Sequence, residues 1–108
     1  MEILNLSKEI YDSVTRLEKG STEIFVLAKE LAEKERDYRR ALAHEIIRLK
    51  DEGERITLIS DIARGLLADE KFERDLAEER LKAGKASLEA IQVRINGLQS
   101  ILRYQNEL

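Results

Sequence analysis

Apolar residues recur at steps of three and four from the start of the chain: Ile3, Leu6, Ile10, Val14 and Leu17. This spacing places them on one face of a helix over residues 2–18, which we expect to end before Gly20. A second helix is expected over residues 22–52, because the polar residues after Gly20 can cap its first turn and Gly53 can terminate it.

Two further helices are predicted after Gly53. A short helix over residues 57–64 fits between Thr57, a candidate N-cap, and the glycine that follows. A long helix is expected over residues 66–105, and propensity alone leaves open whether it continues through Gly84 and Gly97. Its second half carries an apolar seam with a seven-residue repeat, which keeps one edge of a helix against a partner. The seam consists of Leu81, Gly84, Leu88, Ile91, Ile95, Leu98 and Leu102.

The fold class that follows is all-α, as one domain over residues 1–108. We expect a long antiparallel, coiled-coil-like hairpin of helices 22–52 and 66–105, with the short helix capping its tip. The N-terminal helix is expected to fold back at Gly20 and to complete a three-helix bundle at the other end. The composition agrees, since the chain has no proline, 38% charged residues and 5% aromatic residues, a mixture typical of long helices.

A register follows if the hairpin turns near residue 59, because residues whose numbers add to about 118 then face each other. This register places Glu35 beside residues 83–85, within a charged two-helix segment formed by residues 33–41 and 73–85. It also predicts an apolar cluster at the tip of the hairpin. The expected members are Ile46, Ile47, Leu49, Ile56, Leu58, Ile59, Ile62, Leu66, Leu67 and Phe72.

Residues for catalysis or metal binding are scarce. His44 is the single histidine, and no metal ligand lies three or four residues from it. The pairs Glu30–Glu33 and Glu70–Glu73 have a spacing with which all-α pyrophosphohydrolases bind magnesium, but basic residues four positions away explain them as surface ion pairs. We therefore expect no enzyme activity, cofactor or metal. A magnesium-dependent nucleotide hydrolase would require these four glutamates to converge in one pocket.

Small residues beside the seam of helix 66–105 permit the close approach of another helix. With the apolar residues of the short helix they form the candidate interaction surface: Ala83, Ala86, Ser87, Ala90, Gly97, Leu58, Ile59 and Ile62. A thin hairpin exposes more apolar surface than one copy can cover. Self-association is therefore expected, most simply as a two-fold dimer, and the same surfaces are the expected contact with a protein partner.

The alternative is a nucleic-acid interface formed by Arg36, Arg39, Arg40 and Arg48, whose spacing could follow a phosphate backbone. Neighbouring glutamates dilute this charge, and the net charge of −3 predicts no general attraction to nucleic acid or anionic lipid. The apolar runs are too short to span a membrane. A chain without cysteine is compatible with the cytoplasm.

Two segments, residues 57–65 (TLISDIARG) and 98–105 (LQSILRYQ), are joined by a Glu/Arg-rich stretch. Together they resemble small helical proteins encoded by phages and prophages of Gram-positive bacteria. The resemblance covers roughly residues 30–105 and assigns no functional residue. It implies a phage-encoded protein in the host cytoplasm, and under the alternative it implies an accessory protein of phage replication or recombination.

Overall fold

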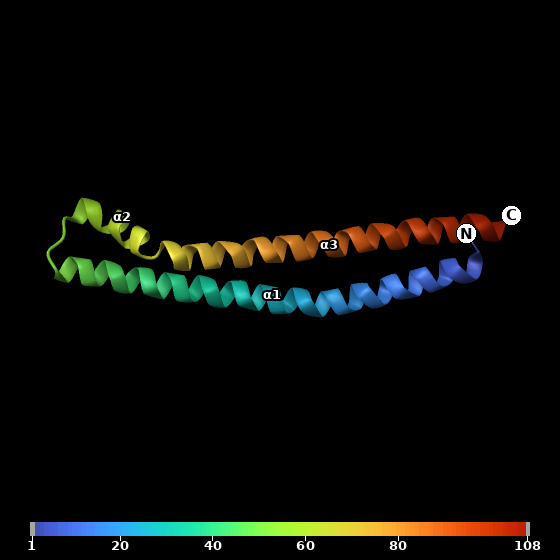
Figure 1. Ribbon diagram of the computed structural model, residues 1–108, viewed down its shortest axis with the longest axis horizontal. Helices are drawn as coiled ribbons and strands as arrows, with labels where there is room; N and C mark the ends of the chain where they lie inside the picture. Colours follow the sequence, from blue (N-terminus) through green and yellow to red (C-terminus); the bar gives the residue numbers. More distant parts are fainter. Residues whose placement is uncertain (1, 108) are drawn as a thin grey trace. The chain divides into compact units, whose positions relative to one another are not determined.

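The computed structural model describes residues 2–107, and nearly all of them are helical (Figure 1). The elements are α1 (Ile3–Asp51), α2 (Ile56–Leu66) and α3 (Ala68–Glu107). No strand occurs in this described range, so the predicted all-α class is confirmed. The short and the last helix lie close to their predicted positions, and α3 runs through Gly84 and Gly97 without interruption.

The two helices predicted before Gly53 are in fact one. Helix α1 passes through Gly20 without a break (Figure 1), so the separate N-terminal helix and its three-helix bundle were wrong. The reason lies in the seam of α1, which continues through the buried Ser13 and then through Leu17, Gly20 and Ile24 at steps of four, three and four. A Cβ added at Gly20 would collide with the side chain of Leu88. Gly20 therefore admits a neighbouring side chain and does not end the helix.

The chain divides into two compact units, and the first contains the chain up to Val26 and from Lys82 onward. Here the first half of α1 packs antiparallel against the second half of α3. Arg94 Nη2 lies 3.3 Å from Glu9 Oε2, and Leu88 lies beside Gly20. Apolar side chains from both helices are buried between them: Leu6, Ile95 and Leu98. The predicted seam of α3 is thus confirmed as the face that meets α1.

The second unit, Leu27–Leu81, contains the turn of the hairpin. Helix α1 ends in a Schellman motif, in which the N–H of Gly53 donates to the carbonyl of Lys50 and that of Glu54 donates to the carbonyl of Leu49, both at 3.1 Å. Gly53 has a φ of 80°, a left-handed conformation that glycine adopts without strain. The chain therefore reverses at Gly53, earlier than the predicted turn near residue 59.

Helix α2 belongs to the returning arm of this turn. Its residues Ile59 and Ala63 are buried against Leu49 of α1. Three half-buried side chains complete the cluster: Leu42, Ile46 and Ile62. Only one face of α2 reaches α1, which leaves Ile56, Leu58 and Leu66 exposed. Ile47 of α1 and Phe72 of α3 are exposed too, so half of the predicted tip cluster lies on the surface.

The early turn also changes the register. Glu35 contacts Arg74 rather than residues 83–85, and Glu30 lies 3.4 Å from Arg80. Both arginines lie within the predicted charged segment of residues 73–85, but Glu35 meets a residue of α3 earlier than the predicted 83–85.

Candidate functional site

The small residues proposed for interaction lie on the solvent-exposed surface of α3. Ala83, Ala86 and Gly97 are exposed. Ser87 and Ala90 are exposed too, and with Arg16, Ile91 and Arg94 they line a shallow hollow of about 270 Å³. The described residues of the first unit leave this stripe uncovered, so another helix can approach it.

The apolar residues proposed on α2 do not share one surface. Ile59 is only 4% exposed and belongs to the core, Ile62 is half-buried, and Leu58 is exposed. Ile59 is therefore unavailable for a large contact with a partner. The exposed apolar surface of α2 is instead formed by Ile56, Leu58 and Leu66.

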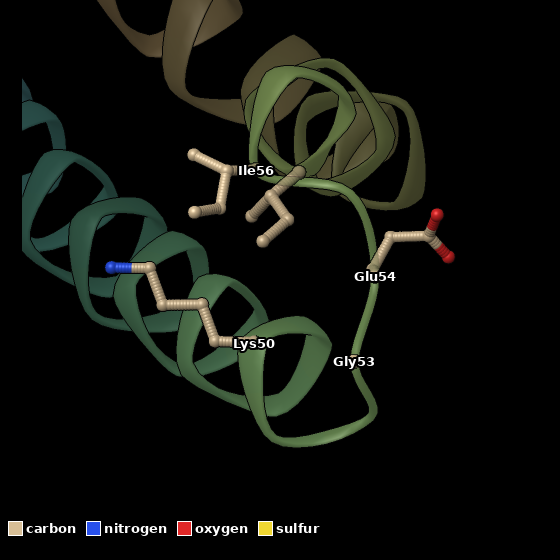
Figure 2. Close-up of a pocket in the computed structure, with 5 residues that line it drawn as sticks. Lys50, Gly53, Glu54 and Ile56 are labelled. Carbon is tan, nitrogen blue, oxygen red and sulfur yellow. The ribbon is translucent and has the colours of Figure 1, made fainter.

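A hollow of about 530 Å³ lies where α1 turns into α2, lined by Lys50, Gly53, Glu54, Ile56 and Ile59 (Figure 2). The figure shows the Glu54 carboxylate pointing away from Lys50 and Ile56. The lining thus combines two isoleucines with one ammonium group and offers no acid–base pair. Such a lining suits apolar contact better than catalysis.

A cluster of charged side chains joins α1 to α3 in the second unit. Arg74 donates hydrogen bonds to Glu35, Asp75 and Glu78, and Arg39 Nε donates to Glu35 at 2.7 Å. The hydrogen bond from Arg39, followed by that from Arg74, lowers the pKa of Glu35, while Glu35 and the two other carboxylates raise the pKa of Arg74. A carboxylate held in this way is a poor general base. The contact of Arg74 with Glu35 joins α3 to α1, and the cluster therefore fixes the register of the two helices.

The predicted arginines are largely neutralised by carboxylates on the same helix. Arg36, Arg39 and Arg48 lie at N–O distances of 2.7–3.0 Å from these partners: Asp37, Glu35, and Glu45 with Glu52. The hydrogen bonds that Arg48 donates to Glu45 and then to Glu52 raise the pKa of Arg48. Arg40 is exposed and has no ion-pair partner within residues 2–107. The four arginines therefore lie on one helix but offer little unpaired positive charge to a phosphate backbone.

The glutamates considered for magnesium do not converge. Glu30 lies near Arg80, and Glu33 lies 4.0 Å from Lys29 of the same helix. Within residues 2–107, no group of three or more acidic or histidine side chains is arranged to hold a metal ion, and His44 is exposed. No helix in that range is both long and apolar enough to cross a membrane.

One feature that sequence reasoning missed is a second apolar stripe on α1, which we call the outer stripe and which consists of Leu4, Tyr11, Val14, Glu18 and Phe25. Leu4, Tyr11 and Phe25 are 78%, 73% and 72% exposed, and Val14 is 36% exposed. The signal was the seven-residue spacing of positions 4, 11, 18 and 25, which places them on one side of a helix that is long enough. The predicted break at Gly20 separated Phe25 from the rest and hid this pattern.

No protein-family model matches this chain, and no curated protein or solved structure is significantly similar to it.

Proposed function

We propose that this chain is a non-enzymatic, self-associating helical protein that acts as a structural or protein–protein interaction module. The observation that carries the proposal is its balance of buried and exposed apolar side chains. Within residues 2–107, fourteen large apolar side chains are exposed, whereas eight apolar residues are buried. Burial of the exposed ones against a second molecule is worth about 25 cal/mol for each Å² removed from water.

The arrangement of these side chains also supports association. Single exposed apolar residues are common on soluble proteins, whereas contiguous ones mark interaction surfaces. Leu4, Tyr11 and Phe25 follow one side of α1. A second molecule can therefore cover several of them at once.

The resemblance of residues 57–65 and 98–105 to small phage proteins supports the wider part of the proposal. It suggests a phage-encoded protein that works in the cytoplasm of the host cell. The process it serves then depends on the partner that its surface recognises.

Light scattering across a hundredfold range of protein concentration tests self-association. We expect a mass above the 12.5 kDa of one chain that rises with concentration to a plateau, and a two-fold dimer would give a plateau at twice that mass. A mass of one chain at every concentration would contradict the proposal.

Nucleic-acid binding has weaker support, because carboxylates hold three of the four predicted arginines. Fluorescence anisotropy with single-stranded and duplex DNA at low salt is expected to show no saturable binding. Binding that weakens steeply with salt, and that disappears when Arg36, Arg39 and Arg40 are replaced together, would favour the alternative instead.

A further inference from the structure

The outer stripe of α1 is an exposed, largely apolar surface, interrupted by Glu18, without a partner in its own unit. Leu4, Tyr11 and Phe25 are all more than 70% exposed, while the buried Leu6 and Ser13 point from the same helix into the contact with α3. Each stripe residue at positions 4, 11, 18 and 25 precedes a seam position by two residues, which turns it well away from the seam. Something other than α3 must cover it if it is to be buried.

The positions of the stripe are spaced symmetrically about their midpoint. Leu4 and Phe25 lie at equal distances from a centre between Val14 and Thr15, and so do Tyr11 and Glu18. A second α1 placed antiparallel about this centre would set Leu4 against Phe25 twice and Tyr11 against Glu18 twice. A surface that complements itself under reversal is what a two-fold interface requires.

Charge is complementary in the same register. Glu18 is the one charged residue in the stripe, and antiparallel pairing places it opposite the phenol of Tyr11 and about one turn from Lys8 of the second copy. Within residues 2–107, neither Glu18 nor Lys8 has an ion-pair partner of its own. The pairing would thus give Glu18 a hydrogen-bond donor and a cation together.

The area is also sufficient. A buried aromatic side chain covers about 150–250 Å², so Tyr11 and Phe25 with Leu4 and Val14 offer about 500 Å² on each copy. Two copies then bury about 1,000 Å², the lower bound for a specific interface. The exposed small residues of α3, such as Ala83, Ala86 and Ala90, offer much less area per residue.

We infer that a second copy of this chain docks antiparallel on the outer stripe of α1, about a two-fold axis beside Val14. The inference rests on the proposed self-association and names its interface. The two copies contribute the same residues, and the contact closes at two chains.

Disulfide trapping tests the register. The chain has no cysteine of its own, so any disulfide that forms must come from the introduced thiols. Val14→Cys lies beside the axis, so mild oxidation is expected to convert most of the protein into a covalent dimer. Leu4→Cys alone is expected to remain uncrosslinked, since its two copies would lie about 30 Å apart. A mixture of Leu4→Cys and Phe25→Cys is expected to crosslink.

The matched control is Val93→Cys on α3, which is 69% exposed and lies outside the stripe. If wild type self-associates in light scattering but Val14→Cys crosslinks no better than Val93→Cys, the inferred interface is wrong and the proposed function stands. A wild type that is monomeric at every concentration overturns both, and would indicate a different protein as the occupant of the stripe.

A charge exchange provides a second test that leaves the helices intact. Glu18→Lys and Lys8→Glu are each expected to weaken the dimer about tenfold by placing like charges together. The double variant restores opposite charges and is expected to return Kd to within about twofold of wild type. Circular dichroism checks that helicity is unchanged. An unchanged Kd in both single variants would overturn the inference.

Discussion

Gly20 lies in the seam of α1 at a position where its missing side chain makes room for Leu88. Glycine costs a helix about 1 kcal/mol relative to alanine, so its presence in the middle of a 49-residue helix needs a compensating contact. Close packing of Leu88 supplies that contact. From the sequence alone, a seam glycine and a terminating glycine look the same, because the difference depends on the residue of α3 that faces it.

Substitution of Gly20 distinguishes these two roles. Gly20→Val is expected to lower the free energy of unfolding by about 2 kcal/mol, because the added carbons displace Leu88. Gly97→Ala on α3 is the control, since nothing lies within 4 Å of its added Cβ, and it is expected to gain up to about 1 kcal/mol. Urea denaturation measures both. A stabilised Gly20→Val would mean that Leu88 does not occupy this space.

Glu35 provides a pH-dependent contribution to stability. Its pKa is lower in the folded chain than its usual value of 4.5, chiefly through Arg39 and Arg74. The ionised form therefore stabilises the fold above this usual value, and its contribution is lost as the pH falls through the lowered pKa.

We expect Glu35→Gln to lower Tm by a few degrees at pH 7, and the gap from wild type to shrink as the pH is lowered toward 3. Asp75, whose pKa is also lowered, is present in both proteins and shares Arg74 with Glu35. Thermal melts at intervals of half a pH unit measure the gap. A gap that widens with acid would contradict the assigned contacts.

At the scale of the element, the period of apolar residues predicted the existence of helices more reliably than the points where they end. The seam of α3 from Leu81 to Leu102 could be read directly, because burial between two helices selects apolar residues at steps of three and four. The turn was misplaced because the predicted register was centred on the short helix at the tip, whereas α2 belongs to the returning arm of the hairpin. Only the left-handed conformation of Gly53 fixes where the chain reverses.

The candidate site was predicted only in part for a related reason. The small residues of α3 could be identified from the sequence, and the structure places them on its exposed surface. The contact of Arg74 with Glu35 depends on the register between α1 and α3. A shift of the turn changes which residues face each other along both helices. The outer stripe follows a seven-residue spacing, but this spacing becomes one surface only if α1 continues through Gly20.

The side chains on the two faces of helix α2 are expected to contribute differently to the stability of the fold. Ile59→Ala is expected to cost about 3 kcal/mol, because Ile59 is buried against Leu49 and Ala63 and its truncation leaves a cavity. Ile56→Ala is the matched control on the same helix, where the side chain is 84% exposed and the expected change is within about 0.5 kcal/mol. Chemical denaturation compares the two, and equal losses would contradict the observed orientation of α2.

At the scale of the whole molecule, folding and assembly are expected to be linked. The buried apolar set is small, so a second copy on the outer stripe adds a large share of the total burial. Binding that occurs only in the folded state stabilises it by about 2.7 kcal/mol when the concentration is a hundredfold above Kd. For a chain of this size, that corresponds to a rise in Tm of roughly 10 °C.

Tm measured across this concentration range is therefore expected to rise for wild type and to remain flat for Tyr11→Glu, which places a charge in the centre of the stripe. Val93→Glu makes the same change at an exposed site on α3 and is expected to keep the wild-type dependence. At the lowest concentration the three proteins should melt within a few degrees of one another, because neither substituted side chain belongs to the core. If Tyr11→Glu retained the rise while Val93→Glu lost it, the link between folding and assembly would run through α3.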